Sequence, residues 1–435
     1  MAGLWAWMVL FAIGLQQPIP KQDLQARLAQ AVDLPTAGER RKAARALATD
    51  RTVSLEQWLA SCRQFSPLSR VPAGSRTDTV NLRVAGKWQQ TPIHLYVSKR
   101  YEADQPAPLI LAHHGAGGSG AGMISLWRPV AEALGAVLVA PDEVGDNQGY
   151  RFQLQERQAA QAVERWARRQ WNVDENRIFL TGVSRGGHLS WDLALRFPDR
   201  YAACMPMIGG PTFLIDGGRN NMRYLENLRD LPIRNLQGSL DQPALLFNLR
   251  HAFRKLQGFG ASDAQLIEFP ELGHQFDFQA VDWLEFLGRS RRQPWPKQVI
   301  RLAARKGEGR NSWVQIKTFT RDVQEEFKLK VEAEHWNSLD EDGRKLHYME
   351  QVDQKTARLE VHWLEAGHFQ ASGRGVKSFS LLLSEAMIGE KGAVKVEFGG
   401  KVRRKKGRPS ARVLLEEFVE SFDRSFLPLA RFDFP

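Results

Sequence analysis

Short apolar runs alternate with helical segments between residues 108 and 288, and this alternation constrains the fold more than any other feature of the chain. The apolar runs lie at 108–115, 136–143, 177–182, 201–210, 231–238 and 264–270. Segments with helical periodicity separate them, at 124–135, 155–171, 186–197, 242–257 and 276–288. Strands buried on both faces are apolar throughout, because helices cover both sides of a parallel sheet. The sequence therefore predicts an α/β domain whose mostly parallel sheet is flanked by helices.

The chain on either side of this domain has other patterns, and its 435 residues are enough for two or three domains. Two strands around a turn near Gly86 extend the α/β domain to residues 77–290. Residues 21–76 are predicted to be a helical segment with a connector, and the basic, proline-containing residues 291–298 a linker. In residues 299–435 a period of two at 326–334, 358–363 and 393–398 predicts an antiparallel β domain, with a terminal helix at 411–426.

The N-terminus is predicted to be a signal peptide over residues 1–20. Its apolar stretch, Leu4 to Leu15, is too short to span a bilayer but has the length of a signal-peptide core. Ala12 and Gly14 fit cleavage between small residues, although no Lys or Arg precedes the apolar stretch. We therefore expect export to the periplasm or the cell exterior, with an uncleaved anchor or a different start as alternatives. Elsewhere we expect no membrane span.

Charge and cysteine content exclude some classes of protein. Two cysteines cannot form a disulfide scaffold. The net charge of the chain is +11. Residues 401–412 contain seven Lys and Arg and no acidic residue. This segment is either a solvated loop or a site of attraction for an anionic polymer or surface. No aromatic residues interleave with these charges, so we expect no nucleic-acid partner.

A serine stands at the corner between an apolar run and a helix. Residues 182–186, Gly-Val-Ser-Arg-Gly, match G-x-S-x-G with a predicted strand before and a helix after. Such a turn holds the hydroxyl of Ser184 at the carboxyl edge of the sheet, where parallel sheets bind ligands. The backbone N–H of Arg185 then lies at the positive end of the helix and can face an oxyanion.

A serine nucleophile needs a base and a carboxylate that orients the base. His274 lies in a glycine-containing loop directly after the apolar run 264–270, whereas His251 lies within a helical stretch. Asp241 lies in a loop just past the run 231–238, and Asp263 is the second choice for the acid. The order serine, acid, histidine is that of the hydrolases built on this corner. Ser184, Asp241 and His274 are the predicted triad.

The second oxyanion donor is expected from the glycine-rich loop after the run 108–115. Ala116 is the first candidate for this N–H and Gly117 the alternative. His113 and His114 precede them, but no carboxylate or cysteine stands near them at ligand spacing, so we expect no metal site and no cofactor.

Residues 105–290 resemble the α/β-hydrolase superfamily, and within it the polyhydroxybutyrate-depolymerase/feruloyl-esterase-like and prolyl-oligopeptidase-like branches. The segments "HHGAGGSG", "RIFLTGVSRGGHLSW", "LQGSLDQ" and "ELGHQFD" stand where those families carry the oxyanion loop, the nucleophile elbow, the acid and the base. The resemblance implies the same triad and covers about two-fifths of the chain. The N-terminal helices and the C-terminal β domain lie outside it.

These features predict a serine hydrolase that cleaves small or polymer-attached carboxylic esters through an acyl-enzyme. The short segment 211–230 leaves room for a flap rather than a lid, so we expect an open cleft. Candidates for its lining are Glu143, Tyr150, Arg219, Arg223 and Tyr224. The alternatives are a serine peptidase of the prolyl-oligopeptidase-like type and a non-catalytic polysaccharide-binding module.

Overall fold

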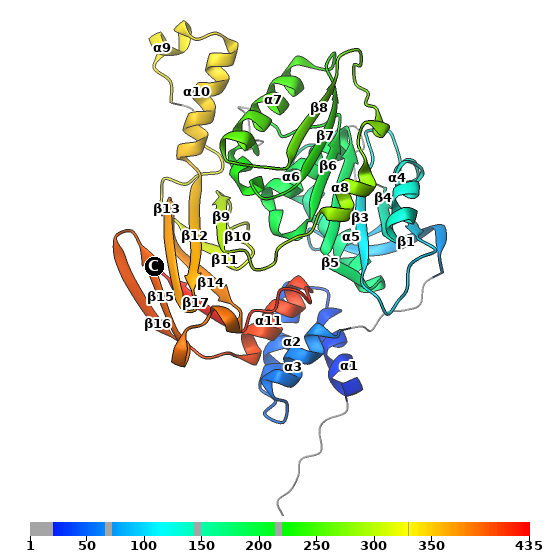
Figure 1. Cartoon of the computed structure of the whole chain (residues 1–435). Coiled ribbons are helices and arrows are strands. Elements are labelled where there is room, and N and C mark those ends of the chain that lie inside the picture. Colours follow the sequence, from blue (N-terminus) through cyan, green and yellow to red (C-terminus); the bar gives the residue numbers. More distant parts are fainter. Residues whose placement is uncertain (1–20, 66–71, 143–148, 214–219, 329) are drawn as a thin grey trace, which may run out of the picture.

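The computed structural model describes residues 21–65, 72–142, 149–213, 220–328 and 330–435 (Figure 1). The predicted signal peptide lies outside these residues. Within the described ranges, no helix combines the length and the apolar character needed to cross a membrane.

A central sheet of eight strands has the order β1-β2-β4-β3-β5-β6-β7-β8. Its strands are β1 (Gly74–Val84), β2 (Lys87–Val97), β3 (Ala107–His113), β4 (Val137–Pro141), β5 (Val173–Val183), β6 (Ala203–Met207), β7 (Ile233–Gly238) and β8 (Ala264–Phe269). Neighbours among β3 to β8 pair in parallel, whereas β2 runs antiparallel to both β1 and β4. The mostly parallel sheet predicted from the apolar runs is confirmed.

Helices cover both faces of this sheet. They are α4 (Gly120–Leu134), α5 (Leu154–Gln170), α6 (Arg185–Arg196), α7 (Pro243–Gly258) and α8 (Trp283–Arg289), with the 3-10 turns η1 (Pro198–Arg200), η2 (Met222–Leu228) and η3 (Phe278–Ala280). Alternate residues of one strand serve the two faces: Leu109 and Leu111 share a core with α5, α6 and α7, whereas Ile110 packs with α4 and α8. This division explains why the strand sequences are apolar throughout. The single helix predicted at 276–288 is wrong. Residues 278–280 form the short turn η3, and Asp282 then caps the separate helix α8.

The C-terminal domain contains two sheets that share one apolar core, as a sandwich does. Its strands are β9 (Gln298–Ala303), β10 (Arg310–Asn311), β11 (Val314–Phe319), β12 (Ala357–Glu365), β13 (His368–Arg374), β14 (Val376–Leu383), β15 (Ala393–Phe398), β16 (Lys401–Lys406) and β17 (Ala430–Phe434), with the 3-10 turns η4 (Glu385–Met387) and η5 (Glu390–Gly392). The sheet orders are β10-β11-β14-β17 and β16-β15-β13-β12-β9. Pairing is antiparallel as predicted, except between β13 and β15, which run parallel.

A helical hairpin interrupts this domain where the sequence predicted a strand at 326–334. The described residues there form an irregular segment that leads into α9 (Ala333–Ser338) and α10 (Glu341–Gln354). Phe327 stacks on Tyr348 of α10 with ring centroids 5.8 Å apart. Val331 of the same stretch is 45% exposed, so the alternating pattern corresponds to neither a strand nor a continuous buried face.

The N-terminal helices and the C-terminal helix form one cluster (Figure 1). The N-terminal helices are α1 (Lys21–Val32), α2 (Ala37–Ala48) and α3 (Leu55–Arg63), and the C-terminal one is α11 (Ala411–Ser421). Trp58 of α3 and Phe418 of α11 are both fully buried in their shared core. α11 ends earlier than the predicted residue 426, because Phe422 adopts a left-handed conformation with φ of 50°.

The basic segment 401–412 begins as β16, the edge strand of its sheet. Most of its Lys and Arg side chains are exposed. Charged side chains on an edge strand hinder pairing with the strands of other molecules. Attraction to an anionic polymer stays a prediction.

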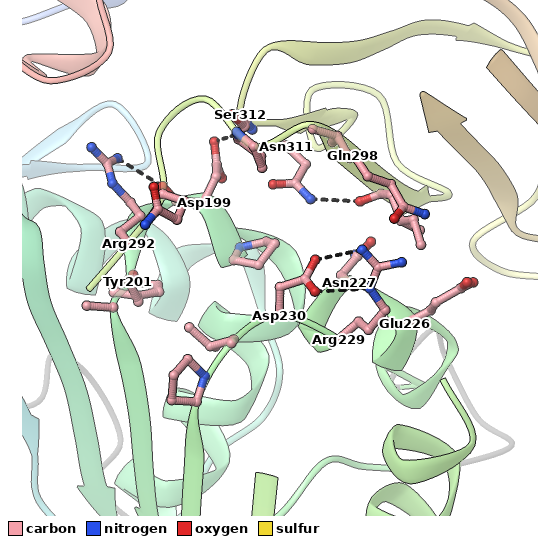
Figure 2. A pocket seen from close by; sticks show the side chains of 18 of the residues that line it. Asp199, Tyr201, Glu226, Asn227, Arg229, Asp230, Arg292, Gln298, Asn311 and Ser312 are labelled. Atoms are coloured by element: carbon pink, nitrogen blue, oxygen red, sulfur yellow. Dashed lines mark hydrogen bonds and ion pairs between the residues drawn. The ribbon is translucent and has the colours of Figure 1, made fainter. Parts of the chain in front are cut away.

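A cavity of about 390 Å³ marks the seam between the two domains (Figure 2). Its lining comes from residues that precede β6 and β7, from the linker, and from β9 and the β10 turn of the C-terminal domain. It therefore lies at the opposite edge of the sheet from Ser184. Polar groups pair across the seam: Asp199 accepts a hydrogen bond from the backbone N–H of Ser312 at 3.0 Å, and Arg292 donates to the carbonyl of Asp199 at 2.9 Å. We interpret this cavity as part of the domain junction.

Candidate active site

Ser184 occupies a sharp turn between β5 and α6. Its backbone has φ of 52° and ψ of −111°, a conformation that a residue with a Cβ rarely adopts and that costs on the order of 1–3 kcal/mol. Two backbone hydrogen bonds hold the turn: Ser184 N–H donates to Met207 at 2.8 Å, and His188 N–H donates to Ser184 at 3.0 Å. The strain is therefore fixed by the neighbouring strand β6 and by the helix itself.

Gly186 allows β3 to approach the first turn of α6. A Cβ at Gly186 would collide with the carbonyl oxygen of His113, the last residue of β3. Main-chain atoms cannot move aside as a flexible side chain can, so this position requires glycine. The second glycine of the G-x-S-x-G pattern thus lets the helix that follows Ser184 begin directly against β3.

The acid and the base reach Ser184 from two later strands. Asp241 follows β7 and His274 follows β8. His274 Nε2 lies 2.8 Å from Ser184 Oγ, and His274 Nδ1 lies 2.8 Å from Asp241 Oδ2. Gly238 keeps the two loops together, since a Cβ there would collide with the carbonyl oxygen of Gly273. The structure brings all three residues of the predicted triad into contact.

Hydrogen bonds fix the charge of Asp241. Burial raises the pKa of this carboxyl, but hydrogen bonds from the Gln242 N–H, His274 and Gln237 outweigh burial and lower the pKa below its usual value. Gln242 N–H and Gln237 Nε2 each lie 2.7 Å from a carboxylate oxygen. Because the carboxylate is ionised, His274 Nδ1 donates to it, which leaves Nε2 to accept the proton of Ser184. Sequence reasoning missed Gln237, which lies within the strand before the acid.

The rival residues serve other contacts. His251 is buried in α7, where its ring stacks on Phe247 with centroids 6.0 Å apart. Asp263 forms ion pairs with Arg234 and Arg289, both at 2.6 Å. Neither residue lines the cavity beside Ser184.

The two residues predicted to donate to the oxyanion line the same cavity as Ser184. Arg185 is the first residue of α6, and its guanidinium is directed to Glu156 at 3.0 Å and to the Gly149 carbonyl at 3.2 Å. Ala116 lines the same cavity as Ser184, and a Cβ on neighbouring Gly115 would lie 3.5 Å from the Ser184 Cβ. The loop after β3 therefore passes directly beside the nucleophile.

A cavity of about 400 Å³ opens over the triad. The side chain of His274 is 48% exposed, which agrees with the open cleft predicted from the short segment 211–230. Of the predicted lining residues, Tyr150 lines the cavity, whereas Arg223 and Tyr224 are buried elsewhere. Glu143 and Arg219 lie outside the described residues.

Two titratable residues of this cavity were not predicted to line it. His188 lies four positions after Ser184, a spacing that places both on one face of α6 and could have indicated it. Burial lowers the pKa of His188, and its Nδ1 lies 2.6 Å from the carbonyl oxygen of Gly210. Lys345 also lines the cavity and comes from α10 of the C-terminal domain. No local signal in the sequence links Lys345 to Ser184.

The strand order and the chain order of the three side chains identify the fold. A mostly parallel sheet with an antiparallel second strand carries the serine after β5, the acid after β7 and the histidine after β8. The domain has the α/β-hydrolase fold. The fold expected from the sequence resemblance is confirmed.

Comparisons with known proteins give matches among solved structures only. No protein-family model matches the sequence, and no curated protein matches it. Among solved structures, a thermostable esterase is 22% identical with a TM-score of 0.41, covering 50% of this chain and 63% of its own. The acylaminoacyl peptidase of Pyrococcus horikoshii is 15% identical with a TM-score of 0.42, covering 51% of this chain and 42% of its own. Esterase 2 of Thermogutta terrifontis is 18% identical with a TM-score of 0.39, covering 51% and 93%.

Proposed function

We propose that the protein is a serine hydrolase that cleaves carboxylic esters. The observation that carries the proposal is the continuous pair of hydrogen bonds, each of 2.8 Å, from Ser184 through His274 to Asp241. A hydroxyl is a weak nucleophile near neutral pH and attacks a carbonyl only with a base beside it. The strained turn, the ionised acid and the oriented imidazole together supply this arrangement.

The reaction proceeds through an acyl-enzyme. Ser184 Oγ attacks the ester carbonyl while His274 Nε2 takes its proton, and Asp241 stabilises the imidazolium. The backbone N–H groups of Arg185 and Ala116 bind the oxyanion of the tetrahedral intermediate. His274 then protonates the departing alcohol, and a water molecule activated by the same imidazole hydrolyses the acyl-enzyme.

A fluorophosphonate probe tests the nucleophile directly, because it phosphonylates an activated serine. The wild-type protein should be labelled, and Ser184→Ala should not. Ser125→Ala is a matched control, since Ser125 is an exposed serine on α4. Absence of label on the wild type would favour the non-catalytic binding module.

The choice of ester over peptide rests on the open cleft, which leaves the acyl and alcohol sides accessible. The serine peptidase is the second candidate, since the same triad cleaves amides. p-Nitrophenyl esters of two to eight carbons, compared with aminoacyl p-nitroanilides, separate the two. A kcat/KM for the anilides that equals or exceeds that for the esters would assign the peptidase. Export through the leader stays a separate prediction.

A further inference from the structure

The C-terminal domain contributes one residue to the lining of the cavity beside Ser184. Lys345 of α10 lines this cavity together with Ser184 and His274. We propose that the Lys345 ammonium binds a carboxylate on the substrate, so that the protein prefers esters whose acyl part carries a second, free acid group. This inference rests on the proposed ester hydrolysis and specifies its substrate class.

Buried contacts hold α10 in place against the α/β domain. Arg223 of η2 is 3% exposed and donates to Thr356 Oγ1 at 2.7 Å and to the carbonyls of Glu325, Gln324, Val352 and Lys355 at 3.0, 2.9, 3.4 and 2.8 Å. Tyr348 of α10 packs edge-on against Phe213, another cavity residue, with centroids 5.2 Å apart. Figure 1 shows α10 projecting from the C-terminal sheets on the side of α7. Lys345 is therefore held beside the triad by contacts between the two domains.

The surroundings of Lys345 leave its charge available to a ligand. Its ammonium lies 4.7 Å from the centre of the Phe247 ring of α7, and its side chain is 21% exposed. Its acidic partners, Glu341 at 2.8 Å and Asp342 at 3.1 Å, are 85% and 60% exposed. The hydrogen bond with Glu341 raises the pKa of Lys345, so the ammonium is charged at neutral pH. Exposed pairs within one helix contribute little, and a substrate carboxylate can compete with them.

Two other polar side chains of the cavity have partners outside it. The guanidinium of Arg185 bonds to Glu156, and the Tyr150 hydroxyl donates to Asp192 at 2.8 Å. Pro211, Phe213 and Leu245 add apolar lining. An acyl chain can therefore lie on the apolar lining with its ester at Ser184 and a terminal carboxylate at Lys345. A hemiester of a dicarboxylic acid has this chemistry.

The test compares two substrates that differ only in charge: the mono-p-nitrophenyl ester of adipic acid and the same ester with its free acid methylated. The readout is the ratio of their kcat/KM values, charged over neutral. We expect the wild-type ratio to exceed one and Lys345→Gln to lower it about tenfold. This loss lies between that expected for an exposed ion pair and that expected for a hydrogen bond to a buried charged group. Lys345→Glu should lower it further. Glu341→Gln should raise it, because it removes a competing carboxylate.

Lys317→Gln is the matched control, since it removes one exposed positive charge from β11 and should leave the ratio as in the wild type. A wild-type ratio of one or less, or equal ratios for the wild type and Lys345→Gln, overturns the inference while ester hydrolysis stands. Hydrolysis of neither ester, together with no fluorophosphonate label, overturns the proposed function and the inference with it.

Discussion

Of the residues outside the cavity, Arg223 should contribute most to holding α10, and with it Lys345, in place. It lies in η2 of the α/β domain, and all five of its hydrogen-bond acceptors belong to the C-terminal domain. Four of these acceptors are main-chain carbonyls at the base of the hairpin that carries α10. Replacement by methionine keeps most of the apolar stem and removes every donor.

We expect Arg223→Met to lower the free energy of unfolding by about 2–4 kcal/mol. Hydrogen bonds made by a charged group contribute about 1.5–3 kcal/mol each, but some of the carbonyls lie partly exposed and can bind water instead. Burial also lowers the pKa of Arg223, which shows that the charge is costly to desolvate, and methionine removes this cost. The net effect is therefore well below the sum of the individual bonds.

Urea unfolding followed by tryptophan fluorescence measures this change, and the charged-to-neutral ester ratio should fall as it does in Lys345→Gln, because α10 loses its support. Arg229→Met is the control: Arg229 pairs with Asp230, which is 73% exposed, so its loss should cost less than about 1 kcal/mol. If Arg223→Met changed neither the unfolding free energy by more than about 0.5 kcal/mol nor the ester ratio, the role assigned to this contact would be wrong.

Three further variants test the site and its supports. Asp241→Asn should lower kcat about 10⁴-fold with the fold intact, because the amide no longer fixes the imidazole tautomer; a loss below tenfold in steady-state ester hydrolysis would contradict this. Gly186→Ala should prevent soluble expression, since its Cβ would collide with the His113 carbonyl, whereas Gly122→Ala in α4 meets open space and should fold; equal yields would refute the collision. Burial lowers the pKa of His251 from 6.5 to about 4, so the unfolded chain binds more protons between these values and the wild type loses stability as the pH falls. Between pH 7 and 4.5, His251→Leu should therefore lose about 2 kcal/mol less than the wild type in urea unfolding, and parallel losses would argue against it.

Local rules of backbone and strand order made the central domain and its triad predictable. The G-x-S-x-G turn needs glycine where β3 meets α6, and this pattern can be recognised from five consecutive residues of the sequence. Asp241 and His274 each follow a strand of the same parallel sheet, so chain order alone places them at one edge. The apolar runs that predict the strands thus also predict where the three side chains meet.

Contacts between distant segments were not predictable in this way. The residues around 326–334 alternate as a strand does, but Phe327 packs on α10, a helix capped by Asp340, and Val331 stays exposed. Gln237 looks like an ordinary strand residue until the fold places its amide on Asp241. Arg223 and Lys345 acquire their roles only because the two domains pack against each other. The spacing of residues along the sequence does not predict this packing.

The apolar core itself crosses the predicted domain boundary at residue 290. Five large buried side chains of the C-terminal domain, together with Ala304, belong to the core beneath α6 and η2: Ile300, Leu302, Tyr348, Met349 and Val352. Burying one such side chain contributes about 1.5–3 kcal/mol, so the five together are worth about 10 kcal/mol, as much as the whole stability of a typical protein. Cutting the chain at 290 would expose the matching surface of the α/β domain and remove Lys345 from the cavity. Loss of activity in such a fragment would therefore follow from the loss of a shared core, and only substitutions in the full chain can separate the role of α10 in substrate choice from its role in stability.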